Sequence, residues 1–190
     1  MEQITWNKCT NPTPMINFLE TSSLHRLLQV FACRCTRRIS GLIPTEAGRK
    51  ALELSEYFCL RNDPCAVIPK EVIALAQIDE EQMRVEMVAA SQASQVQRDA
   101  TCTRFYAAIA ARMTAEFCSD LSVEAANDVS DNVALASAFY STPPYSADGG
   151  PGLPEMQAQF SRDYDSERAA HCELLRELLP VGLHAVTLMT

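Results

Sequence analysis

The sequence predicts an all-α protein, with residues 1–190 forming a single helical domain that folds as a bundle of five to seven helices. Glycine is rare: the chain has six, and three of them fall at positions 149, 150 and 152, so the turns that an all-β fold needs are missing. Residues 80–117 contain no glycine or proline and are rich in good helix formers. Apolar residues between positions 24 and 42 recur with the spacing of one helix face.

The first long element is predicted over residues 22–42. Its apolar residues recur three or four positions apart, and together they span about 120° of the helix circumference. Ser22 or Ser23 can cap its start, and Gly41 followed by Pro44 favours its end. The apolar stripe consists of Leu24, Leu27, Leu28, Phe31, Cys35, Ile39 and Leu42.

The elements on either side follow from turn and capping residues. The run MINFLE at residues 15–20 predicts a short helix or turn after the turn signal NPTP at residues 11–14. Thr45 is the predicted N-cap of a second helix. That helix is expected to reach Leu60 and to end before the Asn-Asp-Pro sequence at residues 62–64.

The middle of the chain is expected to be almost entirely helical. A short helical piece should follow Pro69. Asp79 and Gln82 have the spacing of a capping box and predict a new helix start. From there to Phe117 we expect one long helix, or two helices joined near residues 99–103, where helix propensity is lower.

The last part of the chain predicts two helices around a linker. The helices are expected over residues 123–140 and 155–179. Between them, residues 141–154 form a loop rich in proline and glycine, and loops of this length often carry function. Residues 181–190 are predicted to form an apolar C-terminal arm that packs on the domain or binds a partner.

Composition and charge limit the classes of function. The net charge is −8, which disfavours nucleic-acid binding because phosphate contacts require many lysines and arginines. No apolar run approaches the roughly 18 residues of a membrane span, and the first residues lack the pattern of a signal peptide. The eight cysteines are therefore expected to be reduced thiols in a cytoplasmic protein, each packed as a small apolar side chain.

The closest pair of cysteines, Cys33 and Cys35, does not predict a metal site. Two residues apart on a helix, their side chains point about 200° away from each other, so they cannot bind one ion or form a disulfide. His171 and Cys172 are adjacent and also form a poor chelating pair. No standard spacing of zinc ligands occurs, and we predict no metal ligand and no cofactor.

Catalytic signatures are missing from the sequence as well. No phosphate-binding glycine motif, nucleophile elbow or Glu-x-x-His motif is present. A catalytic cysteine would need a histidine nearby, and the candidates are His25, His171 and His184. A cysteine-dependent hydrolase or redox protein using His25 or His171 is the alternative to a non-enzymatic protein, and a metal-binding bundle is a third possibility.

The densest positive charge lies on the helix at residues 22–42, on and beside the face opposite the apolar stripe. Arginines at this surface could receive a carboxylate-rich or phosphate-bearing partner. They could equally pair with acidic residues of neighbouring helices, which is common and contributes little stability. The residues predicted to bind a partner are Arg26, Cys33, Arg34, Arg37 and Arg38.

The N-terminal region resembles a bacterial protein family without an assigned function. The residues that carry the resemblance are WNKCTNPTPMINFL at 6–19 and LHRLLQVFACRCTRRI at 24–39. The family pattern is W-x-x-C-T-[DN]-P-x-P-M-x-x-F-L followed by L-F-A-C-x-C-x-R-R-I. The resemblance extends over about the first 60 residues, with a weaker similarity in the last helix. It implies no catalytic residue, cofactor or partner, and Thr36 stands where the family carries a further cysteine.

Together these features predict a non-enzymatic helical module that binds another protein, either a different protein or a second copy of the chain. An accessory or regulatory subunit of a bacterial assembly would fit this description. The expected contact regions are the arginine-rich face, the loop at residues 141–154 and the arm at residues 181–190.

Overall fold

The computed structural model describes residues 3–21, 24–61, 68–90, 94–119, 124–142 and 152–179. These ranges contain eight α-helices and one 3₁₀ turn, without a strand, so the predicted all-α class is confirmed and the predicted number of five to seven helices is too low. The helices are α1 (Gln3–Lys8), α2 (Pro12–Thr21), α3 (His25–Arg38), α4 (Glu46–Arg61), α5 (Lys70–Ala89), α6 (Gln95–Ser119), α7 (Glu124–Ser141) and α8 (Leu153–Leu178), and the 3₁₀ turn is Ser40–Leu42.

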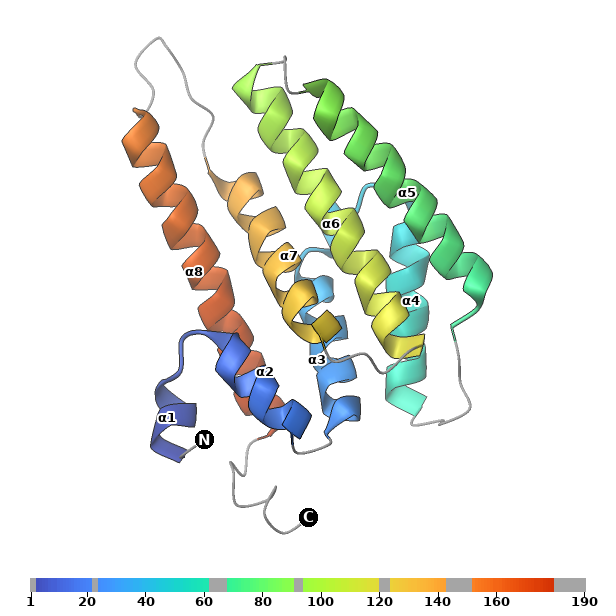
Figure 1. The fold of residues 1–190 in the computed structure, drawn as a ribbon, viewed down its shortest axis with the longest axis vertical. Helices are drawn as coiled ribbons and strands as arrows, with labels where there is room; N and C mark the ends of the chain where they lie inside the picture. The colour runs from blue at the N-terminus through green and yellow to red at the C-terminus, as the bar shows by residue number, and fades with distance from the viewer. Residues whose placement is uncertain are drawn as a thin grey trace.

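The helices are arranged in two layers (Figure 1). The long helices α8, α7, α6 and α5 lie side by side in this order, and α3 and α4 lie behind them. The short helices α1 and α2 cover one end of the bundle, where α2 contacts α8, α3 and α7. Helix α5 lies at the outer edge of the first layer and contacts α6 and α4.

The apolar stripe of α3 points into the main core, as its spacing predicts. Leu28, Phe31 and Cys35 are fully buried, and Ile39 is 4% exposed. The same core contains many alanines of α6 and α7, and these small side chains allow the two helices to lie close together. The predicted N-caps Ser22 and Ser23 lie outside the described residues, and Leu24, the residue before α3, makes no capping bond through its side chain.

The predicted boundaries between α5 and α6 are wrong. Asp79 lies in the middle of α5, which begins directly after Pro69 and continues to Ala89. Helix α5 ends at Ala89 and α6 begins at Gln95, and residues 99–103 lie within α6. The new helix starts with a true capping box at Ser94 and Gln97, in which the Gln97 side chain accepts from the Ser94 amide at 3.2 Å and the Ser94 hydroxyl accepts from the Gln97 amide at 3.4 Å.

The two short N-terminal helices are held by arginines from α8. The Arg176 guanidinium donates to the backbone oxygens of Trp6, at 3.0 Å, and of Cys9. Arg168 donates to the side chains of Asn11 and Thr13, the latter at 2.7 Å. The sequence analysis does not predict α1, and the contact that fixes α1 to α8 joins Trp6 to Arg176, which is 170 positions later in the chain.

The predicted N-cap of the second helix is confirmed, whereas the predicted loop and C-terminal arm stay predictions. Thr45 caps α4, since its hydroxyl accepts from the Gly48 amide at 3.1 Å. Most of the loop at residues 141–154 and the whole arm at residues 181–190 lie outside the described residues. In the part of the chain that the structure describes, no helix is both long enough and apolar enough to cross a bilayer.

Candidate metal centre

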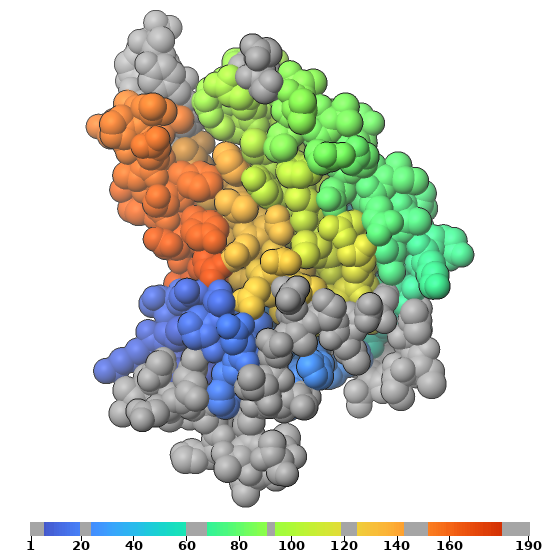
Figure 2. Space-filling view, in the orientation of Figure 1, coloured from blue at the N-terminus to red at the C-terminus, as the bar shows by residue number. Residues whose placement is uncertain are grey.

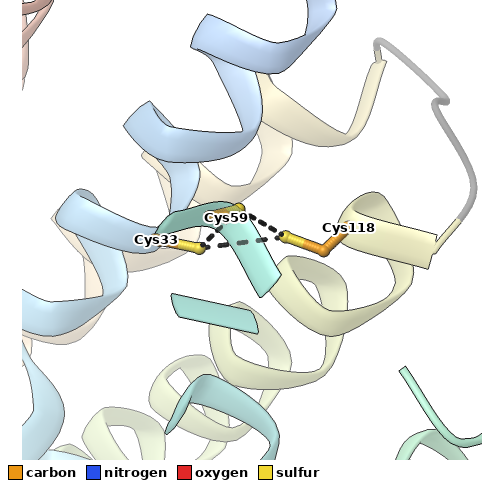
Figure 3. A group of neighbouring side chains, drawn as sticks. All are labelled: Cys33, Cys59 and Cys118. Atoms are coloured by element: carbon orange, nitrogen blue, oxygen red, sulfur yellow. Dashed lines mark hydrogen bonds between the residues drawn. The ribbon is translucent and has the colours of Figure 1, made fainter. Parts of the chain in front are cut away.

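Three cysteines from three different helices meet where α3, α4 and α6 pack together (Figure 3). Cys33 comes from α3, Cys59 from the last turn of α4 and Cys118 from the end of α6. Their Sγ atoms are 3.6 Å apart for Cys33 and Cys59, 3.8 Å for Cys33 and Cys118, and 3.5 Å for Cys59 and Cys118. We call these three residues the tri-cysteine cluster.

The helical geometry of α3 separates Cys33 from Cys35, as predicted. Cys35 is fully buried in the main core with Phe31 and Ile39. Cys33 lies on the opposite side of α3, where α4 and α6 cover it and leave it 3% exposed. The sequence placed this side chain among the arginines, on the face opposite the apolar stripe, and the structure shows that α4 and α6 cover it.

Two polar side chains of α3 hold the other two cysteines in place. Arg26 donates to the backbone oxygens of Phe58 and Cys59, the latter at 2.8 Å, in the last turn of α4. Gln29 donates to the backbone oxygen of Phe117 at 3.1 Å, in the last turn of α6. Backbone oxygens at a helix C-terminus have no partner within the helix, so these bonds cap both helix ends while fixing them next to Cys33.

The cluster is arranged to carry one thiolate. Hydrogen bonds from Cys118 and Cys33 lower the pKa of Cys59 to about 4, and the charge of Arg26 adds to this effect against the opposing effect of burial. Hydrogen bonds to the other two sulfurs and burial raise the pKa of Cys33 well above its usual value. For Cys118 the hydrogen bond with Cys33 lowers the pKa, but the bond to Cys59 and burial raise it more. At neutral pH the three sulfurs therefore share two protons.

The sulfur positions fit a tetrahedral metal ion. Zinc binds thiolate sulfur at about 2.3 Å, which separates two sulfurs by about 3.8 Å in tetrahedral geometry and about 4.0 Å in a trigonal plane. The observed separations of 3.5 to 3.8 Å match the tetrahedral value better. An ion bound to all three sulfurs would lie slightly out of their plane and keep a fourth position for another ligand. Thiolates select Zn²⁺ and Cu⁺ over hard ions such as Mg²⁺, and the two helix C-termini also favour a cation.

The arginines predicted to bind a partner have partners within the chain. Arg26 points to α4, as described above. The others are partly exposed, with side-chain exposures of 48% for Arg34, 53% for Arg37 and 41% for Arg38. Arg34 pairs with Glu177 at 3.5 Å, Arg37 with Glu56, and Arg38 with Glu167 at 2.5 Å. A role for the exposed three in partner binding stays a prediction.

A second polar cluster surrounds His171 and is buried within the bundle. The His171 Nδ1 atom is 2.8 Å from the Ser130 hydroxyl, and its Nε2 atom is 3.3 Å from a carboxylate oxygen of Glu167. The arrangement of Ser130, His171 and Glu167 resembles a catalytic triad of nucleophile, base and acid. However, Ser130 and His171 are fully buried, and the Glu167 carboxylate accepts a hydrogen bond from Arg38. No hydrogen bond described in the structure joins a histidine to a thiol, so the catalytic pairing of a cysteine with His25 or His171 gains no support.

A cavity of about 550 Å³ lies between the 3₁₀ turn and the helices α4, α6 and α7, and it is lined by Ile43 and Phe139. Its volume would suit a small molecule. Its charged side chains make contacts within the chain: Arg49 donates to the Ile43 backbone oxygen at 2.8 Å, Arg104 pairs with Glu86 at 3.3 Å, and Asp99 accepts from the Gln95 amide at 2.6 Å. None of these three charged side chains is therefore without a partner.

The sequence does not predict the tri-cysteine cluster, because its three ligands are far apart in the sequence. Cys33 and Cys59 are separated by 26 positions, and Cys59 and Cys118 by 59. The only signal was compositional, namely eight cysteines in a chain expected to keep them reduced. Comparisons with known protein families, with curated proteins and with solved structures give no match. The family resemblance of the N-terminal region therefore stays a prediction.

Proposed function

We propose that this protein binds a thiophilic metal ion through the tri-cysteine cluster, with Zn²⁺ as the first candidate. The observation that carries the proposal is the triangle of three sulfurs from three helices, with sides of 3.5 to 3.8 Å. Cys33 and Cys59 are 3% and 7% exposed, so the protein would cover most of the ion and leave its fourth position to a ligand outside the three cysteines. The ion would join α3, α4 and α6 at the end of the bundle where Arg26 and Gln29 already connect them.

Metal analysis of the purified protein tests this proposal. Protein prepared without chelators should contain about one zinc ion per chain, or take one up with a submicromolar dissociation constant. Cys33→Ser, Cys59→Ser and Cys118→Ser should each reduce the metal content strongly. Cys102→Ser is the matched control, because Cys102 is a partly buried thiol of α6 outside the cluster. A chain that neither contains nor takes up zinc or copper would contradict the proposal.

A redox protein is the alternative that the same cluster favours. The low pKa of Cys59, about 4, would make its thiolate reactive, and Cys118 lies 3.5 Å away as a partner for a disulfide. Iodoacetamide labelling at neutral pH separates the two functions. Fast labelling of Cys59 that added Zn²⁺ does not slow indicates redox chemistry, whereas protection of all three cysteines by Zn²⁺ indicates a metal site.

We also propose that the chain is a non-enzymatic, cytoplasmic helical interaction module, as the sequence suggests. The supporting observation is an apolar strip on the outer side of α5, where four large apolar side chains are 53% to 65% exposed. Exposed apolar side chains gathered on one face are typical of protein-binding sites. We call it the α5 strip, and its members are Leu75, Ile78, Val85 and Val88.

Affinity capture tests the interaction role. The immobilised protein should retain a binding partner that Ile78→Lys no longer retains. Val96→Lys serves as the control, because Val96 is 53% exposed on α6 and lies outside the strip. Equal retention by the wild type and Ile78→Lys would exclude the α5 strip as the binding surface.

A further inference from the structure

We infer that two adjoining cavities at one end of the bundle bind a small organic cation, in which a protonated amine is attached to an apolar body. The first cavity is the one of about 550 Å³ described above, and the second, of about 150 Å³, lies between α6, α7 and α8. Asp99, Phe139 and Thr142 line both cavities, so the two spaces meet at these side chains. Figures 1 and 2 show this end of the bundle, where the first turns of α6 and α8 lie on either side of the last turns of α7.

Asp99 places a carboxylate where the two cavities meet. The Gln95 amide donates to its Oδ1 atom at 2.6 Å, and the Arg98 guanidinium donates to the Gln95 oxygen at 2.7 Å, so the orientation of Asp99 is fixed. Among the residues that the structure describes, no hydrogen bond reaches the Oδ2 atom of Asp99. Burial raises the pKa of Asp99, and the bond from Gln95 and the charge of Arg98 only partly oppose this effect. The carboxylate therefore keeps one oxygen available to the N–H of a bound ammonium group.

The charges around the cavities favour a cation over an anion. The two arginines of the first cavity already interact with oxygen atoms of the chain, since Arg49 donates to a backbone oxygen and Arg104 pairs with Glu86. Asp99 has a neutral amide as its hydrogen-bond partner, and it is the one charged side chain among the residues described around the second cavity. An ammonium group would gain a charged hydrogen bond there, whereas an anion would be repelled. The net charge of −8 adds a long-range attraction for cations.

The walls of both cavities suit an apolar body, and an aromatic one in particular. The ring of Phe139 lines both cavities, stacks on Tyr106 with 5.6 Å between the ring centroids, and packs against Phe160 at 4.8 Å. These contacts hold the wall in place before a ligand binds, which reduces the cost of binding. Aromatic rings also attract a nearby cation through their negative faces. The volume of the first cavity lies within the range of small-molecule sites.

Three probes that share a naphthalene body and differ in charge test this inference, namely naphthylmethylamine, naphthylmethanol and naphthoate. Isothermal titration calorimetry of the full chain at neutral pH should show that the amine binds with a dissociation constant below about 1 mM. The neutral alcohol should bind at least tenfold more weakly than the amine, and the carboxylate more weakly still. A carboxylate that binds as tightly as the amine would show that charge at Asp99 does not select the ligand. That result, or an amine that does not bind, would overturn the inference.

Substitutions in and beside the cavities locate the bound amine. Asp99→Asn keeps the shape of the side chain and removes its charge, so it should raise the dissociation constant of naphthylmethylamine at least tenfold and leave that of naphthylmethanol unchanged. Asp165→Asn is the matched control, because Asp165 is exposed on α8 and lies outside the residues that line the two cavities.

Gly41→Phe tests the position of the apolar body. Gly41 lines the first cavity, and no atom lies within 4 Å of a Cβ added to it, so the new ring should occupy part of the space and weaken the binding of both the amine and the alcohol. Far-ultraviolet circular dichroism should show that all three variants remain folded. Equal effects of Asp99→Asn and Asp165→Asn on the amine, or unchanged binding to Gly41→Phe, would place the ligand elsewhere and overturn the inference.

Discussion

Cys33 and Cys35 show that the face of a helix on which a cysteine lies can decide its chemical environment. Burial in the apolar core raises the pKa of Cys35 and keeps its thiol protonated. Two positions earlier, Cys33 faces two further sulfurs that come from α4 and α6. The sequence predicts this separation correctly from helical geometry, but it does not reveal which residues cover Cys33.

Metal binding by the tri-cysteine cluster should release about two protons, since Cys59 is already a thiolate above its pKa of about 4 while the pKa values of Cys33 and Cys118 are raised. Between pH 6 and 8 the apparent affinity for zinc should therefore rise about a hundredfold per pH unit. Competition titrations with a chromophoric chelator at three pH values measure this slope. A tenfold change per unit would mean that only one of Cys33 and Cys118 loses a proton on binding.

Arg26 should act as a positioning residue for the cluster. Arg26→Leu removes the donor for two backbone oxygens at the end of α4 and should lower the free energy of unfolding by about 2 kcal/mol. It also removes the positive charge that helps to lower the pKa of Cys59 to about 4, so labelling of this thiol in the metal-free protein should slow at pH 4 to 5, near that pKa. Arg37→Gln, which breaks an ion pair with a half-exposed arginine, should leave both properties nearly unchanged. Equal effects of the two substitutions would contradict this role.

At the scale of helices, sequence reasoning succeeded where a signal is local. The stripe of α3 and the N-cap at Thr45 both depend on residues within a few positions, and both are confirmed. The boundary between α5 and α6 was misplaced because Asp79 and Ser94 carry similar capping patterns, and only packing decides which one begins a helix. The metal centre could not be predicted for the same reason, since its ligands are brought together only by the packing of α3, α4 and α6.

Gly48 provides a test of the packing between α4 and its neighbours. A Cβ atom added to Gly48 would lie 2.8 Å from the Ile43 side chain and 3.2 Å from the Thr45 hydroxyl, which are closer than normal contacts. Gly48→Ala should therefore lower the free energy of unfolding by about 1 to 3 kcal/mol, although alanine usually favours a helix. Gly41→Ala, where no atom lies within 4 Å of the added Cβ, should change it little. Urea denaturation compares the two, and a stabilising Gly48→Ala would show that the neighbouring side chains move aside.

At the scale of the whole molecule, the thiols link stability to pH. Burial raises the pKa of Cys35, and it raises that of Cys172 to about 12, while Cys33 and Cys118 are raised within the cluster. In the unfolded chain all four should ionise near the usual value of 9.0. Above this pH the unfolded state binds fewer protons than the folded state, so folding becomes less favourable as pH rises.

The metal-free protein should therefore be stable up to about pH 8.5 and should lose stability progressively above pH 9, as the pH rises towards the folded-state pKa values. Zinc should reduce this loss, because Cys33 and Cys118 are already thiolates when they bind an ion and no longer resist ionisation. Cys35 and Cys172 lie outside the cluster, so part of the alkaline loss should persist in the zinc-bound protein. Thermal unfolding from pH 7 to 10.5, with and without zinc, measures both parts. Identical pH dependence in the two states would contradict metal binding by the cluster, and no alkaline loss in the metal-free protein would contradict the raised pKa values.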